Sequence, residues 1–231
     1  MYLNKWLGLI GLTLALVAGS AAAQIKAGRD YKPLGAPQAV ETGDKIEVVE
    51  FFWYGCSHCF DLEPFLKKWT SKLPKDVEFR RVPAIPTERW APNARTYYTL
   101  EAMGLLDKLH GEVFDAIHID RVNFNDEKTQ LDWMAKKGVD RNKFAETWKS
   151  FSVQSKTKRA VQQTQANDIS GVPTLVVDGK YQTSVSMAGS HEALLKVLDE
   201  LIVKARAERK KKYGYFVGVL CGSGLPAAKQ R

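Results

Sequence analysis

The fold of this chain is decided by one short segment, Glu50-Phe51-Phe52-Trp53-Tyr54-Gly55-Cys56-Ser57-His58-Cys59. Its apolar half continues a β-branched and aromatic run that begins at Ile46, and such a run predicts a buried strand. Tyr54 and Gly55 make a turn, and residues 56–71 then carry apolar side chains at helical spacing. The sequence therefore predicts a Cys-x-x-Cys pair at the N-terminus of a helix that follows a buried strand.

The position of Cys56 at a helix N-terminus favours its thiolate form, because unpaired backbone N–H groups and the helix dipole stabilise an anion there. His58, when protonated, adds a positive charge within reach. A stabilised thiolate is a good leaving group and favours the reduced protein, which makes the disulfide oxidising. Cys59, one turn further along, is expected to be more buried and to act as the resolving thiol.

Other uses of a Cys-x-x-Cys motif have less support in this sequence. A zinc site would need a second pair of ligands, and the chain has only three cysteines and no His-x-x-x-His sequence. A c-type haem would need a histidine at residue 60, which is Phe. A four-residue disulfide loop also constrains an unfolded chain little. Redox chemistry without a metal or cofactor is therefore predicted.

Further along the chain, a second β-rich run at residues 77–82 predicts a parallel strand–helix–strand unit. Residues 84–160 have helical spacing and are predicted to form a helical insertion, in which Asp126 and Asp140 are expected to cap helix N-termini. Residues 174–177 and 180–186 have strand patterns, and Asp178-Gly179 between them predicts a two-residue hairpin turn. Ser190 is then expected to cap a long helix. The predicted fold class is α/β: one mixed sheet in two parts, residues 24–83 and 161–212, that flank the helical insertion.

The N-terminus has the pattern of an export signal. Lys5 precedes a short apolar run over residues 6–17, and Ala21-Ala22-Ala23 fits a cleavage site. The alternative, a membrane anchor, would need a longer apolar run. Residues 1–23 are therefore predicted to be a signal peptide.

The net charge of +8 does not indicate a nucleic-acid-binding protein, because it is not spread over the body of the chain. Residues 204–231 hold eight basic residues and one acidic residue, whereas residues 24–203 hold 25 of each. A solvated, basic helix end explains this excess. Residues 213–231, which include Cys221, form a tail to which the sequence assigns no role.

The segment from Glu50 to Cys59 resembles the active-site segment of the DsbA family of periplasmic disulfide oxidases, with Ser57 where proline is common. The resemblance covers about residues 28–207 and includes Gly171-Val172-Pro173-Thr174. It implies a thioredoxin-like fold with an inserted all-helical domain and a periplasmic location. It also implies disulfide donation to reduced, unfolded exported proteins and reoxidation by a DsbB-like membrane quinone reductase. A monomer is expected.

The resemblance also implies roles for individual residues. Pro173 matches the family's cis-proline, and a cis bond there would expose the Val172 backbone to an extended substrate. Glu50 would be a partly buried carboxylate beneath the redox pair that takes a proton from Cys59. Among the aromatic residues, Phe51 and Phe52 are expected in the core, whereas Tyr54 is expected to be exposed and to line a substrate groove.

Two other functions remain open from the sequence. A disulfide reductase or isomerase would use the same cysteine pair, although isomerases of this fold usually carry a dimerisation domain, for which residues 24–45 are too short. A non-enzymatic thiol module, such as a metal chaperone or an adhesin-like binding domain, is the third possibility. The histidines at 110, 118 and 191 are expected to be surface or capping residues.

Overall fold

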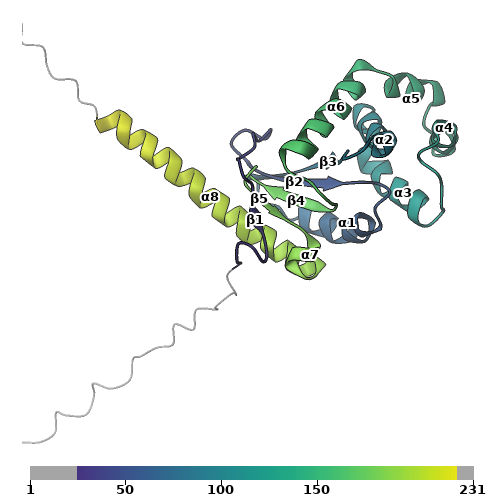
Figure 1. Cartoon of the computed structure of the whole chain (residues 1–231). Helices are drawn as coiled ribbons and strands as arrows, with labels where there is room; N and C mark the ends of the chain where they lie inside the picture. Colours follow the sequence, from purple (N-terminus) through teal and green to yellow (C-terminus); the bar gives the residue numbers. More distant parts are fainter. Residues whose placement is uncertain (1–24, 223–231) are drawn as a thin grey trace, which may run out of the picture.

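Strand β2 (Ile46–Phe52) is an interior strand of the sheet, and all seven of its residues are buried. In the computed structural model, which describes residues 25–222 and their side chains as far as residue 211, it lies in a five-stranded mixed sheet of order β1-β5-β4-β2-β3 (Figure 1). The other strands are β1 (Lys32–Pro33), β3 (Val77–Pro83), β4 (Thr174–Val177) and β5 (Tyr181–Thr183). The predicted signal peptide and residues 223–231 of the tail lie outside the described residues.

The unit β2–α1–β3 has the predicted parallel arrangement. Helix α1 (Ser57–Thr70) contains Pro64 and connects the two strands. Strands β2 and β3 pair in parallel, so that Glu50 lies opposite Arg81. The parallel pairing confirms the crossover connection that the sequence predicts. The register also places Glu50 and Arg81, two charged residues, side by side in a buried part of the sheet.

The helices between β3 and β4 gather at one end of the sheet (Figure 1). They are the short 3₁₀ helix η1 (Glu88–Trp90), α2 (Ala91–Ala102), α3 (Leu106–His118), α4 (Glu127–Lys136), α5 (Arg141–Trp148) and α6 (Phe151–Ala166). The carboxylates of Asp126 and Asp140 each accept a hydrogen bond of 2.7 Å from a backbone N–H in the first turn of α4 and α5, as predicted. The exact limits of the inserted domain, residues 84–160, stay a prediction.

The chain then returns to the sheet through a tight hairpin. Asp178 and Gly179 both have positive φ, 54° and 61°, and the Lys180 N–H donates to the Val177 carbonyl oxygen at 3.0 Å, so a tight turn forms where it was predicted. Because Val177 pairs with Tyr181, three residues connect β4 and β5 rather than the predicted two. Strand β5 is shorter than predicted because Ser184 ends it and caps a short helix, α7 (Val185–Ala188), by accepting a hydrogen bond from the Met187 N–H. Helix α8 (His191–Gly222) follows, capped by Ser190 as expected.

Residues 24–45 contain more regular structure than the sequence indicates. Strand β1 pairs with β5, with Lys32 opposite Gln182. A two-residue edge strand has no periodic pattern that a sequence could reveal.

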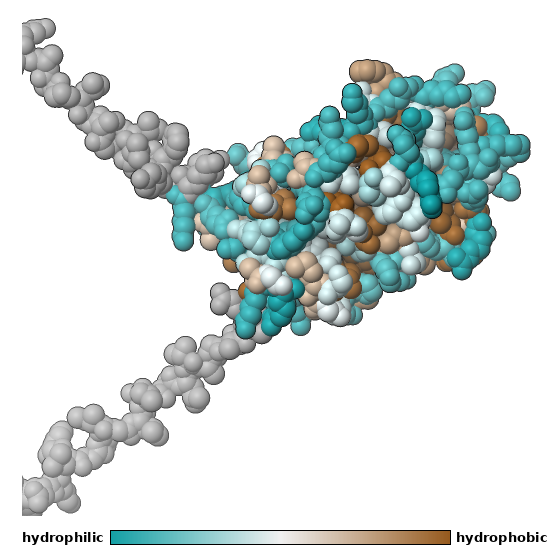
Figure 2. All heavy atoms as spheres, in the orientation of Figure 1, coloured by the Kyte–Doolittle hydropathy of each residue, from teal (hydrophilic) through white to brown (hydrophobic). Residues whose placement is uncertain are grey.

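Two apolar cores form on the two sides of the sheet, since alternate residues of a strand face opposite sides. One contains Val48 and Leu175 of the sheet with Leu62 of α1 and Leu198 of α8. The other contains Val49 and Phe51 with side chains of the inserted helices. Phe52, the last residue of β2, also packs in this second core, so Phe51 and Phe52 are both core residues as predicted. Most side chains on the face in Figure 2 are hydrophilic, with smaller apolar areas between them. No helix within residues 25–222 has the length and apolar character needed to cross a membrane.

Candidate redox site

The redox pair lies where β2 ends and α1 begins. Cys56 is the N-cap residue of α1, with extended backbone angles, and its sulfur accepts a hydrogen bond of 3.3 Å from the Cys59 N–H. Cys56 is half-buried, whereas Cys59 is fully buried, with 0% of its surface exposed. Both are free thiols in this structure. The predicted difference in burial between the two cysteines is therefore confirmed.

The two thiols differ in acidity. The hydrogen bond from the Cys59 thiol lowers the pKa of Cys56 to about 7, and the N–H groups of Cys59 and His58 and the charge of His58 act in the same direction, against partial burial. Burial, with the neighbouring Cys56 and Glu50, raises the pKa of Cys59 well above its usual range. Near neutral pH the Cys56 sulfur is therefore ionised in about half of the reduced molecules, whereas Cys59 stays a thiol.

A second backbone segment, the loop at Val172 and Pro173, lies beside the pair although it is distant from it along the chain. The Val172–Pro173 peptide bond is cis, as predicted, and the Cys56 thiol donates to the Val172 carbonyl oxygen at 3.4 Å. A groove of about 500 Å³ opens beside this loop. It is lined by His58, the loop residues 170–174, and residues of α7 and the start of α8, including His191. His191, which was expected to be a surface or capping residue, therefore lines this groove.

Glu50 lies in the interior with 0% of its surface exposed, which is deeper than the partly buried position expected. Arg81 donates from Nε to Oε2 of Glu50 at 3.0 Å, and from a terminal nitrogen to both oxygens of Glu63 at 3.1 Å. Within residues 25–222, Oε1 of Glu50 has no hydrogen-bond partner. Burial raises the pKa of Glu50 to about 8, although the charge of Arg81 opposes the shift.

The expectation that Tyr54 is exposed is wrong. Its side chain is fully buried, and its hydroxyl lies 2.8 Å from Nδ1 of His110. Its backbone carbonyl accepts a hydrogen bond of 2.8 Å from Nε2 of His118. Both histidines of α3 therefore contact the turn, His110 as a buried residue and His118 as a half-buried one, because the His110 and Phe114 rings of α3 pack against the Tyr54 ring. A side chain in this position does not reach a substrate.

Gly55 allows this turn to pack against Trp53. A Cβ atom on Gly55 would overlap the indole ring of Trp53, which stacks on Trp90 with ring centroids 4.3 Å apart. We expect Gly55→Ala to lower the free energy of unfolding by about 1–3 kcal/mol, because the stacked rings must move. Urea denaturation measures this loss. Gly111→Ala, which meets no atom within 4 Å, is the matched control and should be neutral or stabilising.

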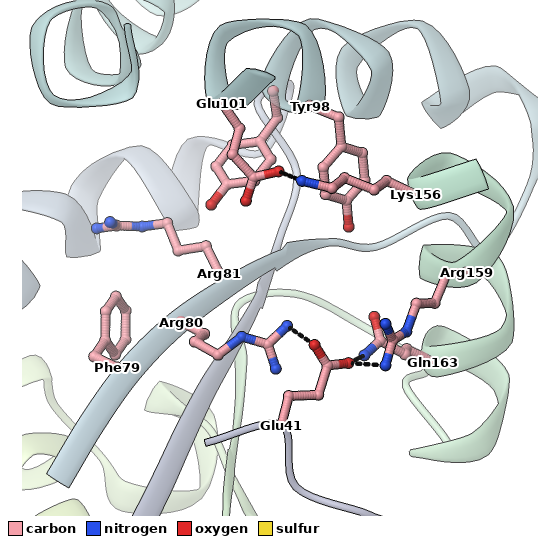
Figure 3. Close-up of a pocket in the computed structure, with 10 residues that line it drawn as sticks. Glu41, Phe79, Arg80, Arg81, Tyr98, Glu101, Lys156, Arg159 and Gln163 are labelled. Carbon is pink, nitrogen blue, oxygen red and sulfur yellow. Dashed lines mark hydrogen bonds and ion pairs between the residues drawn. The ribbon is translucent and has the colours of Figure 1, made fainter. Parts of the chain in front are cut away.

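A second pocket, of about 410 Å³, lies between β3, α2 and α6 (Figure 3). Its charged side chains pair with one another: Glu41 binds Arg80 at 2.7 Å and Arg159 at 2.5 Å, and Lys156 binds Glu101 at 2.7 Å. In Figure 3 the Arg81 side chain points away from this cluster, since neighbouring residues of a strand face opposite sides. Arg81 thus belongs to the redox site.

Three residues of the site were missed by sequence reasoning: Glu63, Arg81 and His110. Glu63 lies one helical turn after Cys59, and a carboxylate at that spacing is a usable signal. Arg81 could have been found from the register of β3 against β2. His110 has no local signal, because only the packing of α3 brings it to the turn.

Comparisons with known proteins agree with this geometry. Residues 76–198 match a family model described as a DSBA-like thioredoxin domain. The chain is 41% identical over 202 residues to the thiol:disulfide interchange protein DsbA of Pseudomonas aeruginosa, which covers 87% of this chain and 96% of that protein. It is 43% identical over 185 residues to the protein of the same name from Azotobacter vinelandii, over 80% of this chain and 86% of that protein.

The crystal structure of Pseudomonas aeruginosa DsbA superposes with a TM-score of 0.77 at 41% identity, over 80% of this chain and 97% of that chain. The crystal structure of the oxidoreductase DsbA from Xylella fastidiosa superposes with a TM-score of 0.74 at 29% identity, over 79% of this chain and 98% of that chain. The thioredoxin-like fold with inserted helices is thereby confirmed. The chain belongs to the DsbA family of disulfide-donating thiol:disulfide oxidoreductases.

Proposed function

We propose that Cys56 is the sulfur that substrates attack and that Cys59 is the resolving thiol. A substrate thiolate forms a bond to Cys56 Sγ, the Cys56–Cys59 bond breaks, and Cys59 leaves and gains a proton. A second substrate thiolate then attacks the substrate sulfur of the mixed disulfide, and Cys56 leaves as a thiolate. The substrate loses two electrons and the enzyme gains them. The lowered pKa of Cys56, about 7, is the observation that carries this assignment, since it makes Cys56 the better leaving group.

Glu50 is the proposed proton carrier for Cys59. A carboxyl group with a pKa of about 8 is mostly protonated at pH 7, so it can donate to the departing Cys59 sulfur. In the reverse direction, when the pair is reoxidised, the same carboxylate takes the proton back. His58 contributes positive charge near Cys56 and, being exposed, lies where a substrate passes.

The substrate is proposed to bind as an extended segment along the loop at Val172 and Pro173. Val172 presents its backbone beside Cys56, and the adjoining groove of about 500 Å³ accepts flanking side chains. Recognition through backbone groups suits many different unfolded chains. The proposed clients are reduced exported proteins in the periplasm, the proposed reoxidant is a DsbB-like membrane quinone reductase, and the protein acts as a monomer. Tyr54, being buried, is no longer assigned to substrate binding.

The pH dependence of Cys56 alkylation tests this assignment. In the reduced Cys221→Ser protein, which keeps both active-site thiols, we expect the alkylation rate at Cys56 to rise with a midpoint near pH 7. Below this midpoint the thiol is protonated and unreactive; above it the rate is constant. Mass spectrometry of the labelled peptide measures the rate.

The same protein in denaturant is the control, because both thiols should there titrate together near pH 8.5. A folded-state midpoint that coincided with the denatured one would remove the electrostatic basis of the proposal.

A further inference from the structure

A chain of buried polar side chains runs from the redox pair into the inserted helices. Arg81 links Glu50 to Glu63, and Glu63 Oε1 lies 3.2 Å from Nε2 of His110. His110 Nδ1 in turn meets the Tyr54 hydroxyl at 2.8 Å. His110 is 8% exposed and the Tyr54 and Glu50 side chains are fully buried, so this chain is largely closed to water.

The direction of each hydrogen bond follows from the chemistry of the groups. An ionised Glu63 only accepts, so Nε2 of His110 carries a hydrogen and donates it. Burial lowers the pKa of His110 despite its bond to Glu63, and the imidazole is therefore neutral at pH 7. Nδ1 then accepts from Tyr54, whose pKa burial raises well above its ordinary value. His110 is fixed as the tautomer that donates to Glu63.

Glu50, Arg81 and Glu63 together need one proton. With both carboxylates ionised the group carries a net negative charge in a buried place, and with both protonated it carries a positive one, so a single shared proton gives neutrality. The remaining titratable groups near it are Cys56 and Cys59 of α1 and the phenols of Tyr54 and Tyr97. Burial raises the pKa of Tyr97 also, so neither phenol is charged at neutral pH.

The two carboxylates are not equally placed to hold that proton. Glu63 accepts hydrogen bonds at both oxygens from Arg81 and a further one from His110. Glu50 accepts one, and its Oε1 has no partner within residues 25–222. Hydrogen-bond donors stabilise the ionised form of a carboxylate, so they leave Glu63 charged and the proton on Glu50.

We propose that His110 is a positioning residue that keeps the shared proton of this group on Glu50, beside Cys59, by donating a hydrogen bond to Glu63. Without that donor, the proton divides between the two carboxylates and is less often available where the Cys59 sulfur departs. The effect passes through Glu63, since His110 touches neither sulfur. The inference rests on the proposed role of Glu50 as the proton carrier.

Two amide substitutions at the same position separate this effect from packing. The amide nitrogen of His110→Gln occupies roughly the place of Nε2 and still reaches Glu63, whereas the shorter His110→Asn does not. Phe114→Leu is a further control, because the Phe114 ring packs on His110 with centroids 5.3 Å apart and takes no part in the hydrogen bonds. The loss of packing should resemble that of His110→Asn.

The readout is the pH titration of the two carboxyl carbons by NMR in the reduced full chain, assigned with Glu50→Gln and Glu63→Gln. In His110→Asn we expect the titration midpoint of Glu63 to rise and that of Glu50 to fall. The difference between the two midpoints should narrow by about one pH unit or more, which is a tenfold change in how the proton is distributed between the two carboxyl groups. His110→Gln and Phe114→Leu should keep the wild-type gap. An unchanged gap in His110→Asn, or an equal narrowing in Phe114→Leu, would overturn the proposal.

A double variant tests whether the effect of His110 passes through Glu63. In a Glu63→Gln background the His110→Asn change should no longer move the Glu50 midpoint, because the path through Glu63 is gone. A persisting shift would contradict the proposed path. The role of Glu50 is tested separately by the rate of disulfide transfer in Glu50→Gln. An unchanged rate would show that Glu50 is not the proton carrier, but it would not contradict the proposal that His110 keeps the shared proton on Glu50.

Discussion

Replacing Cys56 with serine is expected to lower the rate of disulfide transfer to a reduced peptide by a factor of at least about 10³, as removal of a covalent catalytic group does elsewhere. Serine offers no disulfide and its hydroxyl does not ionise near neutral pH. It is, however, a good helix N-cap, so its oxygen can replace the sulfur that accepts from the Cys59 N–H, and the fold should persist.

The measurement is the rate at which the oxidised protein forms a disulfide in a two-thiol peptide, with circular dichroism to show that the variant is folded. Cys221→Ser is the matched control and should transfer disulfides at the wild-type rate. Transfer by Cys56→Ser within tenfold of wild type would mean that the pair at 56 and 59 is not the donor.

Replacing Arg81 with leucine is expected to lower the free energy of unfolding at pH 7 by about 3–5 kcal/mol, because it leaves two buried carboxylates without their shared cation. The expected loss depends on pH. Without Arg81 the folded-state pKa of Glu50, already raised by burial, rises further, and the lowered pKa of Glu63 rises as well. The destabilisation is therefore small in acid and grows as the pH rises. Chemical denaturation at pH 5 and pH 8 measures the loss in the free energy of unfolding and shows whether this loss grows as the pH rises.

An exposed ion pair provides the comparison. Lys128→Ala breaks the pair between Lys128 and Asp132, which lies on the surface of α4, and should cost less than about 1 kcal/mol at either pH. The double variant Arg81→Leu/Glu63→Gln should recover part of the stability, because it removes the buried charge that Arg81→Leu leaves without a cation. A loss in Arg81→Leu no greater than that in Lys128→Ala would show that the guanidinium does not compensate these carboxylates.

The main elements of the fold could be predicted because their signals are local. The apolar run before Cys56 predicts a strand, Asp126 and Asp140 predict helix starts, and Asp178-Gly179 predicts a hairpin. Each depends on side chains within a few residues of one another along the chain. Strand β1 was missed because two residues at a sheet edge carry no such pattern.

The candidate site could be predicted only in part, for a related reason. The Cys-x-x-Cys pair and the cis peptide at Val172–Pro173 belong to short motifs, and the structure has both where they were expected. The sequence does not show which way Tyr54 faces, because a residue beside a turn can face either way. The direction is set by α3, whose residues lie more than fifty positions later. His110 was set aside for the same reason.

The sequence by itself determined that this chain carries a redox pair at a helix N-terminus after a buried strand, because helix-end electrostatics act within one turn of Cys56. Only the tertiary structure decided the further surroundings of that pair: how deeply Glu50 is buried, which cation links it to Glu63, and which imidazole contacts Glu63. These contacts join residues from β2, α1, β3 and α3 that are distant in the chain. Burial removes the water that would otherwise screen them, and it is this desolvation, absent from any local pattern, that gives Glu50 and His110 their altered acidities.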